Sequence, residues 1–173
     1  MKKFNRKFKR LLKQFKKIIL DSEYDKFLKN IIFLIKKNKE IEENKKQGGI
    51  NNLNLEKTPA KRGEVFIVDF GYNIGSEFRY KHYCIVIKVE RNTAIVIPLT
   101  SKNHNLDSCI NLGIIKKLKN NKNTISFALL NQMRSISRAR LIRPTNNGKV
   151  QFIKLDNNQL NIIDHELKKY LSK

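Results

Sequence analysis

The spacing of hydrophobic residues changes near Arg62, and this change constrains the fold more than any other feature of the chain. Before it, apolar side chains recur about every 3.6 residues, which is typical of amphipathic helices. After it they tend to alternate every second residue, which is typical of β-strands. We therefore expect a helical N-terminal part, followed by a domain built mainly from strands.

The N-terminal part is predicted to contain two helices. The first spans residues 3–19, where Phe, Leu and Ile occupy one face and Lys and Arg the other. The second begins at Asp21 or Ser22, which are favoured helix caps, and stops at Gly48-Gly49. Two such helices are expected to form an antiparallel hairpin.

We predict three segments: a basic helical extension over residues 1–46, a linker over 47–60 and one compact domain over 61–173. Several short strands with a single terminal helix indicate an α+β fold that is mainly β. Propensity alone allows both OB-like and SH3-like barrels. The expected elements of the domain are strands at 63–70, 82–90, 93–100, 106–112 (with a short extension at 114–118) and 124–130, an edge strand or turn at 132–138, and a helix at 157–171.

The net charge of +22 predicts a polyanionic partner. Both parts contribute, because residues 1–60 hold 17 Lys and Arg against 7 Asp and Glu, and residues 61–173 hold 20 against 8. No continuous apolar run approaches the ~20 residues that a membrane span needs. We therefore expect nucleic acid as the partner and do not expect membrane attachment.

The two cysteines, Cys84 and Cys109, lie in separate apolar segments. Two isolated cysteines form neither a disulfide framework nor a zinc site, so both are expected to be reduced. Lysines interrupt the first apolar stretch, which is not typical of a signal peptide. These features predict a cytoplasmic protein without a metal or cofactor.

Four short motifs occur in a fixed order within residues 61–171. They are Arg62-Gly-Glu-Val-Phe-Ile-Val-Asp69, Gly75-Ser-Glu77, Ile97-Pro-Leu-Thr-Ser101, and Asn131-Gln-Met-Arg-Ser-Ile136 with Arg140-Leu141 after it. Each motif is weak alone, but in this order the chain resembles the MazF/PemK toxins of type II toxin–antitoxin systems. The resemblance implies the small SH3-like β-barrel of the MazF/PemK/CcdB type with a C-terminal helix.

The resemblance also implies cleavage of single-stranded RNA without metal. In that reaction the ribose 2′-OH attacks the adjacent phosphate, leaving a 2′,3′-cyclic phosphate and a 5′-OH. It needs a proton acceptor, a proton donor and groups that stabilise the charge of the phosphorane. In many members an arginine before the second strand, in an Arg-Pro pair, works with a threonine or serine that ends the third. Thr100 matches the threonine, but His82 and Tyr83 replace the Arg-Pro pair.

This replacement changes the chemistry that the site offers. Arginine is a fixed charge, whereas histidine, with a reference pKa of about 6.5, transfers protons near neutral pH. We predict catalytic roles for His82 as acid or base, for Thr100, and for Glu77 as a base or as a group that positions the RNA. His104 and His165 match no functional position and are interpreted as structural. The predicted RNA-binding residues are Ser76, Arg79, Lys81, Ser101, Gln132 and Arg134.

The leading hypothesis is a sequence-specific endoribonuclease toxin that cleaves mRNA as a homodimer and is neutralised by a small acidic antitoxin. One alternative is a non-catalytic RNA- or DNA-binding regulator on the same barrel, because the family arginine is missing. Another is a topoisomerase poison of the CcdB type, against which the Gly75-Ser-Glu77 motif and Thr100 argue. Besides packing on each other, the basic helices are candidates for nonspecific nucleic-acid binding, for contact with an anionic membrane, or for dimerisation or antitoxin docking.

Overall fold

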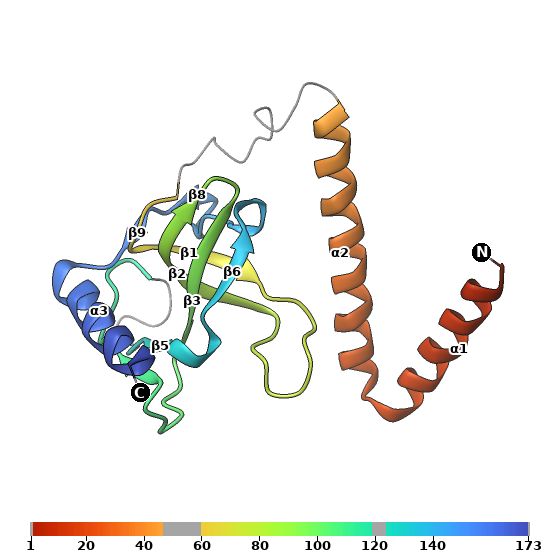
Figure 1. The fold of residues 1–173 in the computed structure, drawn as a ribbon, viewed down its shortest axis with the longest axis horizontal. Coiled ribbons are helices and arrows are strands. Elements are labelled where there is room, and N and C mark those ends of the chain that lie inside the picture. Colours follow the sequence, from red (N-terminus) through yellow and green to blue (C-terminus); the bar gives the residue numbers. More distant parts are fainter. Residues whose placement is uncertain (1, 47–59, 119–123, 173) are drawn as a thin grey trace. The chain divides into compact units, whose positions relative to one another are not determined.

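The computed structural model describes residues 2–46, 60–118 and 124–172. The chain divides into two compact units, Met1–Leu53 and Asn54–Lys173. In the first unit, helix α1 (Lys2–Ile18) is followed by helix α2 (Asp21–Lys46) (Figure 1). The two predicted helices are confirmed. The predicted stop at Gly48-Gly49 lies outside the described residues, as does nearly all of the predicted linker.

Aromatic contacts connect α1 to α2 near the turn between them. The ring of Phe15 lies 5.0 Å from that of Phe27 and 6.3 Å from that of Tyr24, measured between centroids. Towards the start of α1, Phe4 and Phe8 remain exposed, at 70% and 44%. No helix among the described residues is both long and apolar enough to span a membrane.

The second unit is built on a seven-stranded antiparallel sheet in the order β4-β5-β3-β2-β1-β9, with β6 also paired to β3 (Figure 1). A separate hairpin joins β7 to β8. The elements are β1 (Glu64–Asp69), β2 (Lys81–Glu90), β3 (Thr93–Thr100), β4 (Cys109–Asn111), β5 (Phe127–Leu129), β6 (Arg134–Ser137), β7 (Thr145–Asn146), β8 (Lys149–Val150), β9 (Ile153–Lys154) and helix α3 (Asn157–Leu171).

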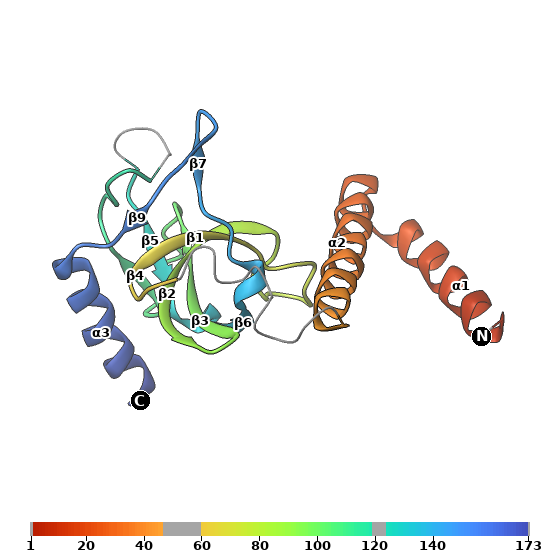
Figure 2. The same ribbon diagram turned by 90° about the horizontal axis from the view of Figure 1, so that it is seen from above.

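The sheet curls because β3 changes its partner partway along its length. Its first half pairs with β6 and its last two residues, Leu99 and Thr100, pair with β5, while β2 lies along its other side. A register shift in β2 between Val86 and Lys88 adds a bulge, which increases local twist. The result is a curled antiparallel half-barrel with a C-terminal helix (Figure 2). The predicted fold class is confirmed.

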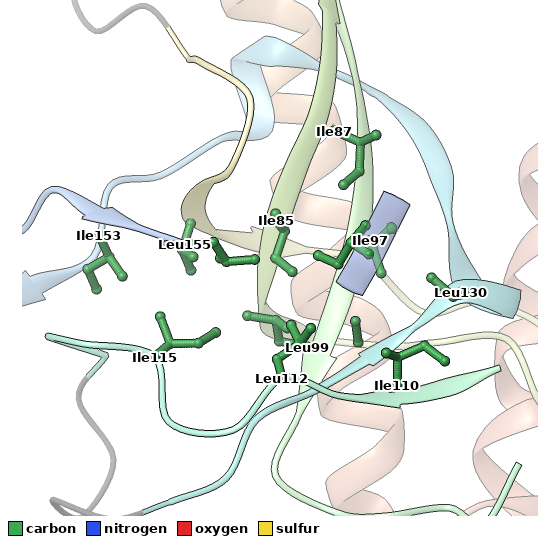
Figure 3. Packing of buried hydrophobic residues seen from close by; sticks show 13 residues of the cluster. Ile85, Ile87, Ile97, Leu99, Ile110, Leu112, Ile115, Leu130, Ile153 and Leu155 are labelled. Carbon is green, nitrogen blue, oxygen red and sulfur yellow. The ribbon is translucent and has the colours of Figure 1, made fainter. Parts of the chain in front are cut away.

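Strand β2 is buried on both of its faces. Cys84 and Val86 belong to one hydrophobic cluster, whereas Ile85 and Ile87 belong to a second cluster on the opposite face. The sequence of a strand that is buried on both faces is a nearly continuous run of apolar residues rather than an alternating pattern. Helix α3 contributes the fully buried Ile163 to the second cluster, part of which is drawn in Figure 3. These two clusters hold the sheet that positions the candidate site.

The Arg62-Gly63-Glu64 motif joins the start of β1 to two distant parts of the chain. Arg62 forms an ion pair with Asp164 of α3. Gly63 adopts φ +80°, and a Cβ added there would lie 3.1 Å from the side chain of Leu160, so glycine suits both the backbone and the packing. The charged start of the motif therefore has a structural role.

Glu64 forms a buried ion pair with Arg143. Its Oε2 atom accepts a hydrogen bond of 3.0 Å from the guanidinium, and the two side chains are only 14% and 9% exposed. The guanidinium also lies 4.1 Å from the ring centroid of Phe66 and 4.8 Å from that of Phe152. The same carboxylate oxygen accepts a hydrogen bond from the backbone N–H of Lys61 at 2.7 Å. This carboxylate therefore sits at a junction of three segments.

Helix α3 begins as the sequence predicts. Asp156 caps it by accepting a hydrogen bond from the N–H of Gln159, whose side chain accepts one from the N–H of Asp156 in return. The buried amide of Gln159 also donates to the carbonyls of Leu112 and Ile114. The side chain of Gln159 thus contributes to the helix cap and also holds the segment that follows β4.

The long strands match their predictions closely, but the short ones are shorter than predicted. The strand predicted at 106–112 is reduced to β4, and the strand predicted at 124–130 is reduced to β5. The extension predicted at 114–118 is wrong: Gly113 and Lys117 have φ of 67° and 66°, so turns replace the strand despite its apolar residues. Of the two alternatives predicted for 132–138, an edge strand or a turn, the structure shows a strand, β6.

Candidate functional site

A cavity of about 590 Å³ opens where β2 begins and β3 ends. The start of β2 contributes charged and aromatic side chains, and the end of β3 with the loop after it contributes hydroxyl, amine and imidazole groups. Its volume is within the range of ordinary ligand sites. The lining residues are Ile67, Phe78, Lys81, His82, Tyr83, Leu99, Thr100, Ser101, Lys102, His104 and Leu118.

The register of the sheet places His82 and Thr100 close together. The last pair between β2 and β3 joins Cys84 to Pro98. His82 lies two residues before Cys84, and Thr100 lies two residues after Pro98, so the two continue the same antiparallel register. Because side chains alternate, both lie on the face of Cys84 and Pro98. Both residues line the cavity, as the predicted catalytic pair requires.

The imidazole of His82 is partly buried against an aromatic ring. Its centroid lies 4.2 Å from that of Phe78, with the two planes inclined at 48°. Burial lowers the pKa of His82 below its ordinary value of 6.5, and a hydrogen bond with the backbone of Arg79 acts more weakly in the opposite direction. The imidazole is therefore neutral at pH 7 and able to accept a proton.

The hydroxyl of Thr100 is oriented by the turn that follows β3. Its Oγ1 atom accepts a hydrogen bond of 3.1 Å from the backbone N–H of Lys102. A threonine hydroxyl can accept and donate at the same time, so this bond leaves the O–H able to donate to a ligand. The exposed amines of Lys81 and Lys102 add positive charge to the cavity, which suits an anionic ligand such as a phosphate.

The loop that carries Ser76 and Glu77 is closed on itself. The side-chain amide of Asn73 donates to the carbonyls of Phe70 and Phe78, at 3.0 and 2.7 Å. This closure leaves Ser76 and Glu77 exposed, and neither lines the cavity. Their predicted roles therefore stay predictions, and the structure does not bring them into contact with His82 or Thr100.

Gln132 and Arg134 contact the aromatic residues Phe78 and Phe70. The Oε1 atom of Gln132 accepts hydrogen bonds from the backbone N–H of Phe78 at 3.0 Å and from the guanidinium of Arg134 at 3.2 Å. The same guanidinium lies 5.4 Å from the ring centroid of Phe70. Gln132 and Arg134 therefore position Phe78, whose ring packs against His82. Neither lines the cavity itself.

The remaining predicted RNA-binding residues divide between the cavity and its border. Lys81 and Ser101 line the cavity. Arg79 instead lies 4.8 Å from the ring centroid of Tyr72 and donates to the carbonyl of Gly75 at 3.1 Å. Its side chain therefore stabilises the loop, and its backbone holds His82.

Lys102 and His104 line the cavity although neither was predicted to have a functional role. His104, which the sequence interprets as structural, is exposed and lines the same cavity as His82. The signal available in the sequence was proximity, since both residues follow Thr100 within four positions. His165 lies on α3 with its side chain 76% exposed.

Neither cysteine lines this cavity, although the thiol of Cys109 donates to the backbone carbonyl of Lys102 at 4.0 Å. Burial raises the pKa of Cys84 to about 12, so its thiol is a packing group and a poor nucleophile at neutral pH. Cys84 and Cys109 are both free. Among the residues that the structure describes, no three His, Cys, Asp or Glu side chains are grouped to hold a metal ion.

The curled sheet, its C-terminal helix and the cavity lined by His82 and Thr100 define a small half-barrel protein. A family model described as PemK-like, MazF-like toxin of type II toxin–antitoxin system matches residues 61–171. The chain belongs to this family, whose members are generally endoribonucleases. No curated protein matches the chain.

Solved structures of MazF proteins match the chain at low sequence identity. MazF (Form-I) from Deinococcus radiodurans has a TM-score of 0.50 and 15% identity, covering 66% of this chain and 97% of that one. Mycobacterium tuberculosis toxin MazF-mt6 has a TM-score of 0.44 and 12% identity, covering 63% and 96%. The MazE-MazF (Form-II) structure from Deinococcus radiodurans has a TM-score of 0.45 and 14% identity, covering 65% and 96%.

Proposed function

We propose that this protein is a cytoplasmic toxin that cleaves single-stranded mRNA at specific sequences, without metal, leaving 2′,3′-cyclic phosphate and 5′-OH ends. Membership of the PemK-like, MazF-like family supports the general activity. The observation that carries the proposal is the cavity that His82 and Thr100 line together with Lys81 and Lys102. It combines a proton acceptor, a neutral donor and two cations in one cavity.

The geometry supports a specific division of roles. A neutral His82 accepts the proton of the attacking 2′-OH, because its lowered pKa keeps it unprotonated at neutral pH. The Thr100 hydroxyl donates to an oxygen of the phosphorane, and the amines of Lys81 and Lys102 stabilise its negative charge. Glu77 lies on the exposed loop and positions the RNA outside the cavity. The aromatic rings of Phe78 and Tyr83 offer surfaces on which unpaired bases stack.

The first prediction tests the reaction directly. Purified, antitoxin-free protein is expected to cut an RNA transcript in the presence of EDTA and to leave DNA of the same sequence intact, because attack needs the ribose 2′-OH. The new 5′ ends should accept phosphate from a polynucleotide kinase without prior dephosphorylation, which identifies a 5′-OH. Cleavage that EDTA abolishes would contradict the metal-free mechanism.

A non-catalytic regulator on the same barrel is the second candidate, and the absence of the family arginine at His82 favours it. The same experiment separates the two. Folded protein that binds the transcript but leaves it uncut from pH 5 to pH 9 would replace the endoribonuclease by the regulator.

The second prediction concerns assembly. We expect a homodimer in solution and binding by a small acidic antitoxin, since residues 61–173 carry 20 basic against 8 acidic side chains. Light scattering at micromolar concentration should give twice the chain mass of 20.4 kDa. A single species at the monomer mass would contradict the dimer and leave the cleavage assay unaffected as a separate test.

A further inference from the structure

The cavity contains two imidazoles. His104 lies on the loop between β3 and β4, four residues after Thr100, and lines the same cavity as His82. The side chains come from different segments, because His82 belongs to β2. Two imidazoles in one site can act as a proton acceptor and a proton donor in the same reaction.

Transfer of a phosphate to the ribose 2′-oxygen requires two proton carriers. The attacking 2′-oxygen and the leaving 5′-oxygen lie on opposite sides of phosphorus in an in-line displacement. A base that takes the proton from one oxygen is therefore badly placed to give a proton to the other in the same step. The family threonine is a poor proton donor for this purpose, since a hydroxyl of its type does not ionise near neutral pH.

Five titratable side chains line the cavity: Lys81, His82, Tyr83, Lys102 and His104. Lysine and tyrosine as residue types titrate near ~10, whereas imidazole titrates near ~6.5. General acid–base catalysis is most effective when the pKa of the group lies near the working pH. With His82 as the base, the second imidazole is the side chain whose chemistry fits the acid.

We propose that His104 is the general acid that protonates the 5′-oxygen leaving group, opposite His82 as the base. This inference rests on the proposed RNA cleavage. The bond from the 2′-oxygen to phosphorus forms while the 2′-OH proton moves to His82. The bond from phosphorus to the 5′-oxygen breaks, and its electron pair stays on that oxygen, which takes the proton of His104. Proton exchange with water then restores both imidazoles.

The surroundings of the two histidines differ in a way that suits His82 as the base and His104 as the acid. Burial beside Phe78 lowers the pKa of His82 and keeps it neutral. His104 is exposed, so water reaches it for reprotonation after each turnover. Lys81 and Lys102 line the same cavity and add positive charge that suits a bound RNA phosphate.

The test compares two substrates with the full-length protein. One is an RNA that contains the site cut by the parent, and the other carries sulfur in place of the bridging 5′-oxygen at that site. A thiolate leaves without protonation, so the second substrate does not need an acid. We expect His104→Ala to cut the ordinary RNA roughly 10²–10⁴-fold more slowly and to cut the sulfur substrate within a few-fold of the parent. His82→Ala is expected to be slow on both.

His165→Ala is the matched control, since this histidine lies on α3, is exposed and does not line the cavity. It should cut both substrates at the parent rate. His104→Ala that cuts ordinary RNA as fast as the parent would overturn the role of His104, as would an equal loss on both substrates. A parent protein that cuts neither substrate would overturn the proposed function itself, which is a distinct result.

Discussion

Replacement of His82 by alanine is expected to slow RNA cleavage by roughly 10²–10⁴-fold, the usual contribution of a general base. The variant should remain folded, because the half-buried imidazole borders the cavity and the core begins two residues later, at Cys84. Single-turnover cleavage of the mapped RNA site measures the effect, and circular dichroism provides the folding control.

The pH dependence gives this prediction a direction. A base must be neutral, so the parent rate should rise with pH through the pKa of His82, which lies below 6.5, and should stop rising above it. His82→Arg restores the positive charge of the family arginine without proton transfer. It should retain part of the rate and lose this acidic limb. If His82→Ala cuts RNA as fast as the parent, then Thr100 and the neighbouring cations carry the reaction.

Replacement of Glu64 by alanine is expected to lower the free energy of unfolding by roughly 3–5 kcal/mol, the cost of leaving a buried charge without its partner. The guanidinium of Arg143 would stay enclosed between Phe66 and Phe152 after its carboxylate is removed. Urea unfolding, followed by circular dichroism, measures the change.

The control for this experiment is Glu90→Ala. Glu90 also lies on a strand and pairs with a lysine, Lys88, but both side chains are at least 60% exposed, so little change is expected. The double variant Glu64→Leu with Arg143→Met should recover part of the lost stability, because an apolar pair leaves no charge buried. A Glu64→Ala effect as small as that of Glu90→Ala would contradict the assignment.

The sequence predicts the long elements well because each carries many periodic residues. The strand predicted at 93–100 is observed at Thr93–Thr100, and the helix predicted at 157–171 is observed at Asn157–Leu171. Strands β4 and β5 are shorter than predicted. Gly113, two residues after the end of β4, has a positive φ, and hydrophobic spacing does not reveal such a turn.

The site could be predicted only in part, for a related physical reason. His82 and Thr100 end long strands, so chain order and register locate them. His104 lies on a loop without periodicity, and only the path of that loop brings it to the cavity. Glu77 is close to His82 in sequence, but it lies on a loop closed by the hydrogen bonds of Asn73 and does not line the cavity.

The two core clusters bear on how this chain tolerates sequence change. All their members belong to the second unit, from Ala60 to Leu167, and no described residue of α1 or α2 contributes to either. Substitutions in α1 and α2 are therefore expected to leave the membership of both clusters unchanged, so the sequence of the helices can vary without altering the core of the half-barrel.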